Sequence, residues 1–494
     1  MSNVIADPTT KTRAGDVRGF VEEGNAVFLG IPYAEPPLGE NRFAAPVAVK
    51  GWKGTRDVLK YGPTAPQNDP GITIIPEPVE PGEDFLNLNV FTPDLGDAKL
   101  PVYVWIHGGG FVSGCNRSPW YRGNRFARDG VVSVTIGYRL GIEGFLRIDD
   151  APANRAVLDW VCALEWVQDN IASFGGDPSN VTIGGQSAGS AACLILMTNP
   201  RAKGLFHRVT GMSGTSDTRM PPENAAQMSA QIAMHLGVKG NRAELSRFSP
   251  DELIAAHAAV ATNPFTADAL TSGFDPGAPG LRPFVDGDVI QSHPFRDIRE
   301  GVGRDVDLVA GSTAEEVTGL LRLQRGAMDD EAAKKALAKM GIAGEKLESY
   351  MKHVGTTDAV EALGQAATDR AFRTPLAQLL EDRAGHEGKT FGYEFRWRSP
   401  AFDGLAGSAH CLDVPFVWDN LDAGRSNMDL LGAEPPQELA DEMHRAWVGF
   451  ITDGDAGWPA YDGDRRAVKR FDTPSAVADD ALAYERELFA KRLG

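Results

Sequence analysis

The chain has 494 residues, of which 42% are hydrophobic and 23% are charged, an ordinary composition for a globular protein. Its formal net charge is −18, which argues against nucleic acid and anionic membrane surfaces as binding partners. No apolar run approaches the ~20 residues of a membrane-spanning helix, so we expect no membrane insertion.

The N-terminus and the cysteines indicate the compartment. Residues 1–8 lack a basic stretch followed by an apolar one, so we expect no signal peptide. The four cysteines have no metal-ligand spacing, and such usage is typical of a reducing compartment. They are Cys115, Cys162, Cys193 and Cys411. We therefore expect a cytoplasmic protein without a metal.

The first third of the chain predicts extended backbone and loops. Residues 16–30 alternate apolar and polar side chains around Glu-Gly-Asn, which predicts a hairpin. Residues 62–82 are dense in Pro and Gly and predict a long surface loop, and residues 86–91 predict a strand. Continuous apolar runs at 100–106 and 131–136 predict strands that are covered on both faces.

The middle of the chain alternates helix and strand. Residues 154–172 carry apolar side chains at helical spacing, residues 181–183 are a short β-branched run, and a buried helix follows Ser187. Further strands are expected at 306–311 and 390–397. This alternation predicts an α/β fold with a mainly parallel sheet flanked by helices.

Helical stretches with a Gly/Pro-rich loop between them interrupt this pattern. We interpret them as cap-like helical insertions over the sheet, at about 216–300 and 325–388, within a single domain spanning 1–494. Two closing helices are expected at about 436–452 and 475–493. We find no internal repeat and no linker between domains. The basic cluster at 465–470 is interpreted as a solvated face.

One motif organises the chain. Gly185-Gln186-Ser187-Ala188-Gly189 is a G-x-S-x-G between the 181–183 strand and a helix. That pattern holds a serine on a sharp strand-to-helix turn, where glycines leave room that side chains would fill. The serine then lies beside a helix N-terminus, which favours negative charge. Because five residues recur by chance, the rest of the chain must supply its partners.

A second motif supplies hydrogen-bond donors. His107-Gly108-Gly109-Gly110 directly follows the 100–106 strand, and its glycines let backbone N–H groups approach a ligand closely. Such a loop forms part of the oxyanion hole in lipases and esterases. An ordinary glycine turn is the alternative for the loop alone, but the downstream G-x-S-x-G favours the catalytic interpretation.

Together these segments resemble the type-B carboxylesterase family, which includes the cholinesterases, in its bacterial para-nitrobenzyl-esterase-like branch. The segment 174–189 and the sequence Glu-Asp-Phe-Leu-Asn-Leu-Asn-Val at 83–90 carry the resemblance, which extends from the hairpin to the Trp-Pro-Ala-Tyr of 458–461. The resemblance implies an α/β-hydrolase fold with a helical cap and a serine carboxylesterase that acts through an acyl-enzyme without a cofactor.

The resemblance also assigns site residues. Ser187 matches the nucleophile, Glu316 the acid that orients the base, and His410 the base. The order Ser, Glu, His is that of α/β-hydrolases. Three positions match the N–H donors of the oxyanion hole: Gly109, Gly110 and Ala188.

Several residues keep alternatives open. Periodicity alone does not separate Glu316 from its neighbour Glu315, and Asp286 is a competing acid that reads as a turn residue. His444 lies in a helical stretch and is interpreted as packing or surface. Four aromatic or apolar residues are candidates for the substrate gorge or for the core: Phe111, Val112, Trp120 and Tyr121.

Three positions depart from the family pattern. Gln186 stands where the family most often has glutamate, Val317 replaces the usual glycine after the acid, and Phe85 replaces a cysteine that forms a disulfide in secreted members. The tryptophan that cholinesterases carry in their early loop has no counterpart within 62–82, so choline esters are not expected.

The sequence therefore predicts an enzyme that hydrolyses a small-molecule carboxylic ester. A carbamate, amide or thioester hydrolase with the same machinery is the alternative within catalysis, and a non-catalytic cholinesterase-like binding protein is the alternative outside it. The natural substrate, its pocket and the oligomeric state stay open.

Overall fold

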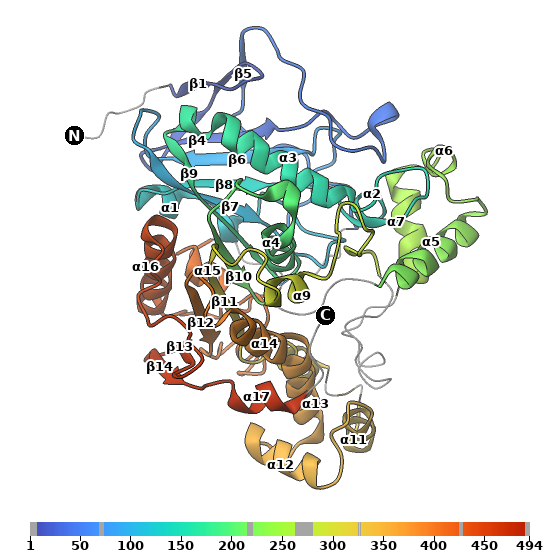
Figure 1. Ribbon diagram of the computed structural model, residues 1–494, viewed down its shortest axis with the longest axis vertical. Coiled ribbons are helices and arrows are strands. Elements are labelled where there is room, and N and C mark those ends of the chain that lie inside the picture. Colours follow the sequence, from blue (N-terminus) through green and yellow to red (C-terminus); the bar gives the residue numbers. More distant parts are fainter. Residues whose placement is uncertain are drawn as a thin grey trace.

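A computed structural model describes residues 7–68, 74–214, 221–261, 280–324, 326, 328–423 and 428–489. An 11-stranded sheet organises this part of the chain, in the order β14-β13-β12-β11-β10-β9-β7-β8-β6-β4-β3 (Figure 1). In chain order its strands are β3 (Phe20–Glu22), β4 (Asn25–Pro32), β6 (Asn87–Thr92), β7 (Leu100–Ile106), β8 (Val132–Ile136), β9 (Gly176–Gln186), β10 (Arg208–Met212), β11 (Asp307–Thr313), β12 (Thr390–Phe395), β13 (Ala467–Phe471) and β14 (Ala476–Asp479).

The sheet is parallel in the middle and antiparallel at its ends. Strands β8, β7, β9, β10, β11, β12 and β13 pair in parallel, whereas β6, β4 and β3 on one side and β14 on the other pair antiparallel. A smaller sheet joins β1 (Thr9–Lys11), β2 (Asp16–Arg18) and β5 (Thr55–Asp57). The predicted strands and the hairpin are thus confirmed, with β9 longer than expected.

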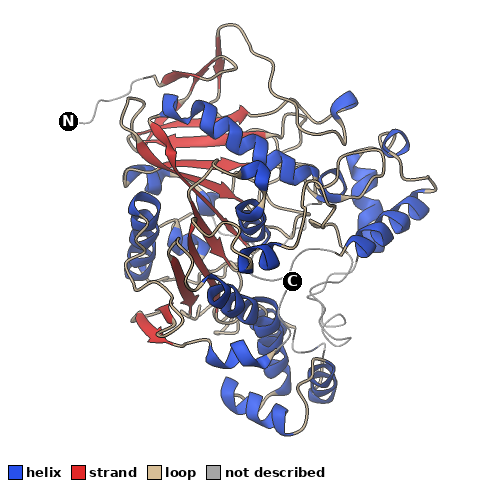
Figure 2. Ribbon diagram, viewed as in Figure 1, coloured by secondary structure: helices blue, strands red, loops and turns tan. Residues whose placement is uncertain are grey.

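Alternate side chains of the central strands pack into two separate cores, one on each face of the sheet, because successive side chains of a strand point to opposite faces. In β7, Val102, Val104 and Ile106 pack into the core that contains α3 (Arg155–Asn170), α4 (Ala188–Thr198) and α14 (Thr374–Arg383). Tyr103 and Trp105 enter the other core, with α1 (Asn124–Arg128) and α16 (Gln437–Asp453). Helices therefore cover both faces of the sheet (Figure 2).

The helices of the expected insertions form two separate groups beside the sheet (Figure 1). The first contains α5 (Pro222–Leu236), α6 (Arg242–Leu245) and α7 (Pro250–Val260), whereas α9 (Pro294–Arg299) packs against α4 and α14. The second contains α10 (Thr318–Leu323), α11 (Asp330–Lys339), α12 (Glu345–Val354), α13 (Ala359–Thr368) and a π-helical turn, Asp369–Arg373, before α14. Residues 215–220 and 262–279 of the first insertion lie outside the described residues. That these groups act as a cap on one domain stays a prediction.

The prediction for the end of the chain is half wrong. The helix expected at 436–452 is α16, but residues 476–479 form β14, and only α17 (Ala483–Leu488) is helical within 475–493. Lys469 pairs with Val477 in an antiparallel register, so this segment closes the edge of the sheet. In the basic cluster Arg465 is exposed, whereas Arg466, Lys469 and Arg470 are half-buried and each pairs with a carboxylate.

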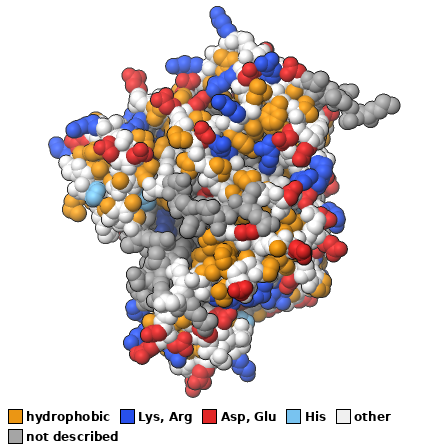
Figure 3. Space-filling model, turned by 180° about the vertical axis from the view of Figure 1, so that it is seen from behind, with side chains coloured by type: hydrophobic (Ala, Val, Ile, Leu, Met, Phe, Trp, Pro, Cys, Tyr) orange, Lys and Arg blue, Asp and Glu red, His pale blue; other side chains and the backbone are white. Residues whose placement is uncertain are grey.

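The surface has no single acidic face in the view of Figure 3, where basic and acidic side chains are interspersed. No helix among the described residues is long and apolar enough to cross a membrane. The loops that follow β7, β9, β11 and β12 leave the same edge of the parallel strands, and all predicted catalytic residues lie on them. That edge is where ligands bind in open α/β sheets.

Candidate active site

Ser187 lies on a strained turn between β9 and α4. Its backbone has φ 56° and ψ −122°, a conformation that residues with a side chain rarely adopt. The two glycines of the motif make the turn possible because other backbone atoms occupy the space of a side chain. A Cβ at Gly185 would lie 2.4 Å from the Gly189 carbonyl carbon, and one at Gly189 would lie 1.9 Å from the Ile106 oxygen.

The donor loop lies directly against this turn. A Cβ at Gly108 would be 2.7 Å from the Gln186 oxygen and 3.3 Å from Ser187 Cβ. Gly109 and Gly110 have φ of +98° and +62°, which glycine adopts readily. Within the described chain, no hydrogen bond uses the N–H of either glycine or of Ala188 at the start of α4. Three donors beside Ser187 are therefore free for a ligand.

His107 anchors the donor loop. Its ring stacks on Tyr138 with centroids 4.3 Å apart, and the Tyr138 hydroxyl donates to the His107 oxygen at 2.8 Å. Burial lowers the pKa of His107 to about 4, so the ring is neutral at neutral pH. The sequence pointed to the glycines of this loop but not to this anchor.

Glu316 and His410 meet at the same edge of the sheet. Glu316 Oε2 accepts a hydrogen bond from His410 Nδ1, and Glu316 Oε1 accepts one from the Thr313 N–H at 2.8 Å. The Glu316 side chain is fully buried, whereas the imidazole is 17% exposed. Because a carboxylate only accepts, this contact fixes the proton on Nδ1 and makes Nε2 the acceptor of the ring.

The charge of Glu316 controls the protonation of His410. Burial alone would lower the pKa of His410, but the Cys411 sulfur and the Glu316 carboxylate against the ring raise it well above the ordinary value. Burial also raises the pKa of the Cys411 thiol, so the sulfur is uncharged at neutral pH. Glu316 is therefore the source of the negative charge that favours the imidazolium.

Gln186 connects the histidine to the serine turn. Its Nε2 lies 3.2 Å from His410 Nε2, so the amide donates to the nitrogen that would accept the serine proton. Its Oε1 is buried without a hydrogen-bond partner among the described residues. A neutral amide here adds no charge to the one that Glu316 already supplies.

The two adjacent glutamates have different contacts. Glu315 pairs with Arg322 at 2.6 Å and with Arg398 at 2.6 Å, and its Oε2 accepts from the Ser408 N–H at 2.9 Å. Ser408 is two residues before His410, so Glu315 ties the acid loop to the histidine loop. This role carried no signal in the sequence.

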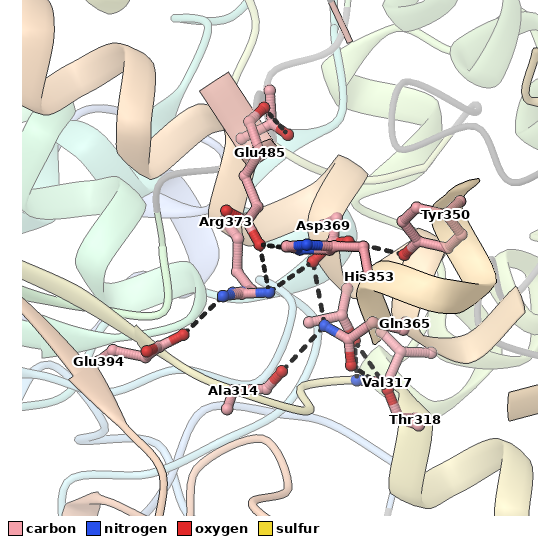
Figure 4. A network of polar contacts seen from close by, with 12 residues as sticks. Ala314, Val317, Thr318, Tyr350, His353, Gln365, Asp369, Arg373, Glu394 and Glu485 are labelled. Carbon is pink, nitrogen blue, oxygen red and sulfur yellow. Dashed lines mark hydrogen bonds and ion pairs between the residues drawn. The ribbon is translucent and has the colours of Figure 1, made fainter. Parts of the chain in front are cut away.

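Helix α13 holds the backbone on both sides of Glu316. Gln365 Nε2 donates to the Ala314 oxygen at 3.1 Å, and the Val317 N–H donates to Thr368 Oγ1 at 3.0 Å (Figure 4). Gln365 is held in turn by Asp369 at 3.0 Å. Sequence reasoning missed these residues because neither their type nor their spacing marks them.

Val317 and Phe85, two departures from the family pattern, are structurally accommodated. Val317 has φ −109°, which needs no glycine, and its side chain packs between α10, α11 and α13. Phe85 is 3% exposed in the main core. Its position therefore contributes packing in place of a cross-link.

Phe111 and Trp120 lie in the core. Phe111 is 2% exposed, and its ring packs edge-on against Phe145 with centroids 5.1 Å apart. Trp120 is 1% exposed. Their burial favours the core interpretation over the gorge. By contrast, Val112 lines a mainly apolar cavity of about 300 Å³ together with Ile142 and other residues of the loops and of α7.

The alternative candidates for the acid and the base, Asp286 and His444, make structural contacts instead. Asp286 accepts hydrogen bonds from the N–H groups of Asp288 and Val289, both at 2.7 Å, as the turn interpretation expected. His444 is buried between the Val417 oxygen and Asp129. In the described part of the chain, His, Cys, Asp and Glu form no cluster that could hold a metal ion.

Comparisons with known proteins identify the family of the chain. A model of the carboxylesterase family matches residues 6–485. Phenmedipham hydrolase of Pseudarthrobacter oxydans is 33% identical over 98% of this chain and 98% of its own. Para-nitrobenzyl esterase of Bacillus subtilis strain 168 is 32% identical over 96% of this chain and 97% of its own.

The crystal structure of the Geobacillus stearothermophilus carboxylesterase EST55 at pH 6.2 superposes with a TM-score of 0.83 and 33% identity. It covers 97% of this chain and 99% of its own. The chain therefore belongs to the carboxylesterase family and is a carboxylic ester hydrolase with the α/β-hydrolase fold.

Proposed function

We propose that this hydrolase acts through Ser187, His410 and Glu316 as a catalytic triad. Ser187 Oγ attacks the ester carbonyl while His410 Nε2 accepts its proton, and Glu316 keeps that proton-accepting tautomer and stabilises the imidazolium. His410 then protonates the leaving alcohol. A water molecule repeats the sequence on the acyl-enzyme and releases the acid.

The developing oxyanion accepts hydrogen bonds from the backbone N–H groups of Gly109, Gly110 and Ala188. Losing one such donor typically costs about 10²–10³ in rate, so these groups matter nearly as much as the base. The observation that carries the proposal is the bridge of His410. Its Nδ1 contacts Glu316, and its Nε2 lies 3.2 Å from Gln186, the residue before Ser187.

Covalent labelling tests the nucleophile. An organophosphate should add one phosphoryl group to the intact protein, located on Ser187 by peptide mass spectrometry, and Ser187→Ala should take up none. Ser190→Ala, one turn later in α4, is the matched control and should label fully. A wild-type protein that neither labels nor hydrolyses any ester would support the non-catalytic binding protein instead.

We propose a small-molecule carboxylic ester as the substrate, with carbamates, amides and thioesters as the alternatives. A panel with one acyl group and matched ester, carbamate, anilide and thioester leaving groups decides among them. Phenmedipham and a para-nitrobenzyl ester belong in that panel because related enzymes bear their names. The ester should have the highest kcat/KM. A higher value for the carbamate would assign the protein to the alternative class.

We propose the cytoplasm as its compartment. All four cysteines are free thiols, which is the usage of a reducing environment. Secretion of the active enzyme by its native host would contradict this assignment.

A further inference from the structure

A cavity of about 450 Å³ lies beside the acid loop, near the carboxyl ends of β12 and β13. Three carboxylates line it, those of Glu315, Glu361 and Glu485. Five guanidinium groups line it as well, an unusual concentration in a chain with a net charge of −18. They belong to Arg322, Arg373, Arg396, Arg398 and Arg470.

One buried carboxylate beside the cavity, that of Glu394, accepts hydrogen bonds from three of these arginines. Glu394 Oε2 accepts from Arg396 at 2.9 Å and from Arg470 at 3.0 Å, and Glu394 Oε1 accepts from Arg373 at 2.6 Å. Burial alone would raise the pKa of Glu394, but the three guanidinium groups lower it to about 2. The positive field at this end of the cavity therefore outweighs the cost of burying the carboxylate.

The three carboxylates that line the cavity pair with Arg322, Arg373 and Arg398, and not with Arg396 or Arg470. Figure 4 shows Arg373 between Glu394 on one side and Asp369 and Glu485 on the other, so three carboxylates contact this one guanidinium group. Arg396 and Arg470 share a single oxygen of Glu394. The register of β12 and β13 pairs Glu394 with Arg470, and Arg396 is two residues further on, so their side chains leave the sheet on one face.

Donors remain available in the cavity. The side chains of Arg396, Arg398 and Arg470 are 40%, 56% and 34% exposed. Among the described residues, each guanidinium group contacts one carboxylate only. Arg322 is 10% exposed, and its Nη1 is buried without a partner in the described part of the chain.

We propose that this cavity binds the phosphate group of a small soluble ligand between Arg396, Arg398 and Arg470. Guanidinium groups present planar pairs of N–H donors that match the oxygens of phosphate. Arg396, Arg398 and Arg470 each contact one carboxylate and keep further N–H donors for such a ligand. The inference is independent of the roles proposed for Ser187, His410 and Glu316, because binding needs none of them.

Binding of inorganic phosphate and pyrophosphate to the full chain tests the site. We expect a saturable rise in the thermal midpoint and a measurable Kd by calorimetry, both at an ionic strength held constant with sodium chloride. Arg396→Gln/Arg470→Gln should raise the Kd about tenfold or more, since each removes charged hydrogen bonds. Arg465→Gln, which breaks only an exposed pair with Asp479, should leave the Kd unchanged.

Arg398→Gln keeps the test decisive if the double variant does not fold, because that side chain is the most exposed of the three. It should raise the Kd while hydrolysis of a para-nitrophenyl ester shows that the fold is intact. The proposal is overturned by an equal thermal shift in chloride alone, or by a Kd that is the same in wild type, Arg398→Gln and Arg465→Gln.

Discussion

The serine side and the histidine side of the active site are built by different means. On the serine side, backbone packing sets the geometry, because Gly185 and Gly189 lie where any side chain would overlap backbone atoms. On the histidine side, side chains set it: Gln365 and Thr368 hold the loop of Glu316, and α13 and α14 are joined by the π-helical turn that places Phe372 5.2 Å from the His410 ring.

This difference predicts two kinds of failure. Closely packed backbone on the serine side has no space for an added atom, so a single added methyl group there should abolish both stability and activity. On the histidine side, separate hydrogen bonds each contribute about 0.5–1.5 kcal/mol, so removing one of them should lower activity only in part. Single substitutions on each side of the active site therefore distinguish these two kinds of failure.

The largest effect is expected for Gly189→Ala. The new Cβ would lie 1.9 Å from the Ile106 oxygen, so we expect about 3 kcal/mol or more of destabilisation and loss of activity. Gly463→Ala is the control, because a Cβ there meets nothing within 4 Å. Thermal midpoint and kcat/KM report the result, and a near-native Gly189→Ala would refute the backbone argument.

Glu316→Gln comes next. Removing the charge leaves the amide to hold the wrong tautomer of His410, so kcat should fall about 10³–10⁴-fold. Glu316 raises the pKa of His410, and the base must be neutral. Wild-type activity should therefore decline on acidification with a midpoint above ~6.5, and the variant's midpoint should be lower.

A pH profile of kcat/KM from 5 to 9 measures that shift. Glu315→Gln is the matched control: it should lower stability and leave the midpoint in place, because Glu315 contacts Arg322 and Ser408 and not the imidazole. A flat wild-type profile between pH 5 and 8 would count against His410 as the base.

Gln365→Leu should have a moderate effect. Losing the bond to the Ala314 oxygen loosens the acid loop, so we expect kcat to fall about tenfold or less with little change in KM. Tyr350→Phe removes a bond to Asp369 one step further away and should lower the thermal midpoint without changing kcat. Equal kcat values in the two variants would show that α13 is only structural support.

The smallest effect is expected for Gln186→Glu. A carboxylate 3.2 Å from His410 Nε2 favours the imidazolium and should raise the acidic midpoint by about 1 pH unit. Activity at alkaline pH should change little. Gln186→Leu separates charge from contact, since it removes the amide without adding charge. An acidic midpoint that moves equally in Gln186→Glu and Gln186→Leu would disprove the electrostatic interpretation.

Sequence predicted the serine side well and the histidine side only in part. Glycines at 108, 109, 185 and 189 are visible in the sequence, and at each of them a Cβ would overlap neighbouring atoms. Glu315 and Glu316 have the same chemistry and adjacent positions, so only the fold shows which one meets His410. Phe111 follows the donors in sequence, yet its φ of 67° turns the ring into the core.

The end of the chain shows a similar limit. Its polar residues are compatible with helix, but β14 forms because β13 offers a free edge, a tertiary circumstance that overrides local preference. On its other side β13 pairs with β12, and this register places Arg470 against Glu394. Of the basic cluster that was interpreted as a solvated face, Arg470 thus lines the cavity.

The spacing of the catalytic contacts has a consequence for folding. His410 meets Glu316 across 94 residues of chain and Gln186 across 224. Contacts so distant in sequence form late and slowly, because loop closure must precede them. After dilution from denaturant, the recovery of hydrolysis should therefore lag behind the return of the helical circular-dichroism signal. The rate at which hydrolysis returns then reports when the central sheet is complete.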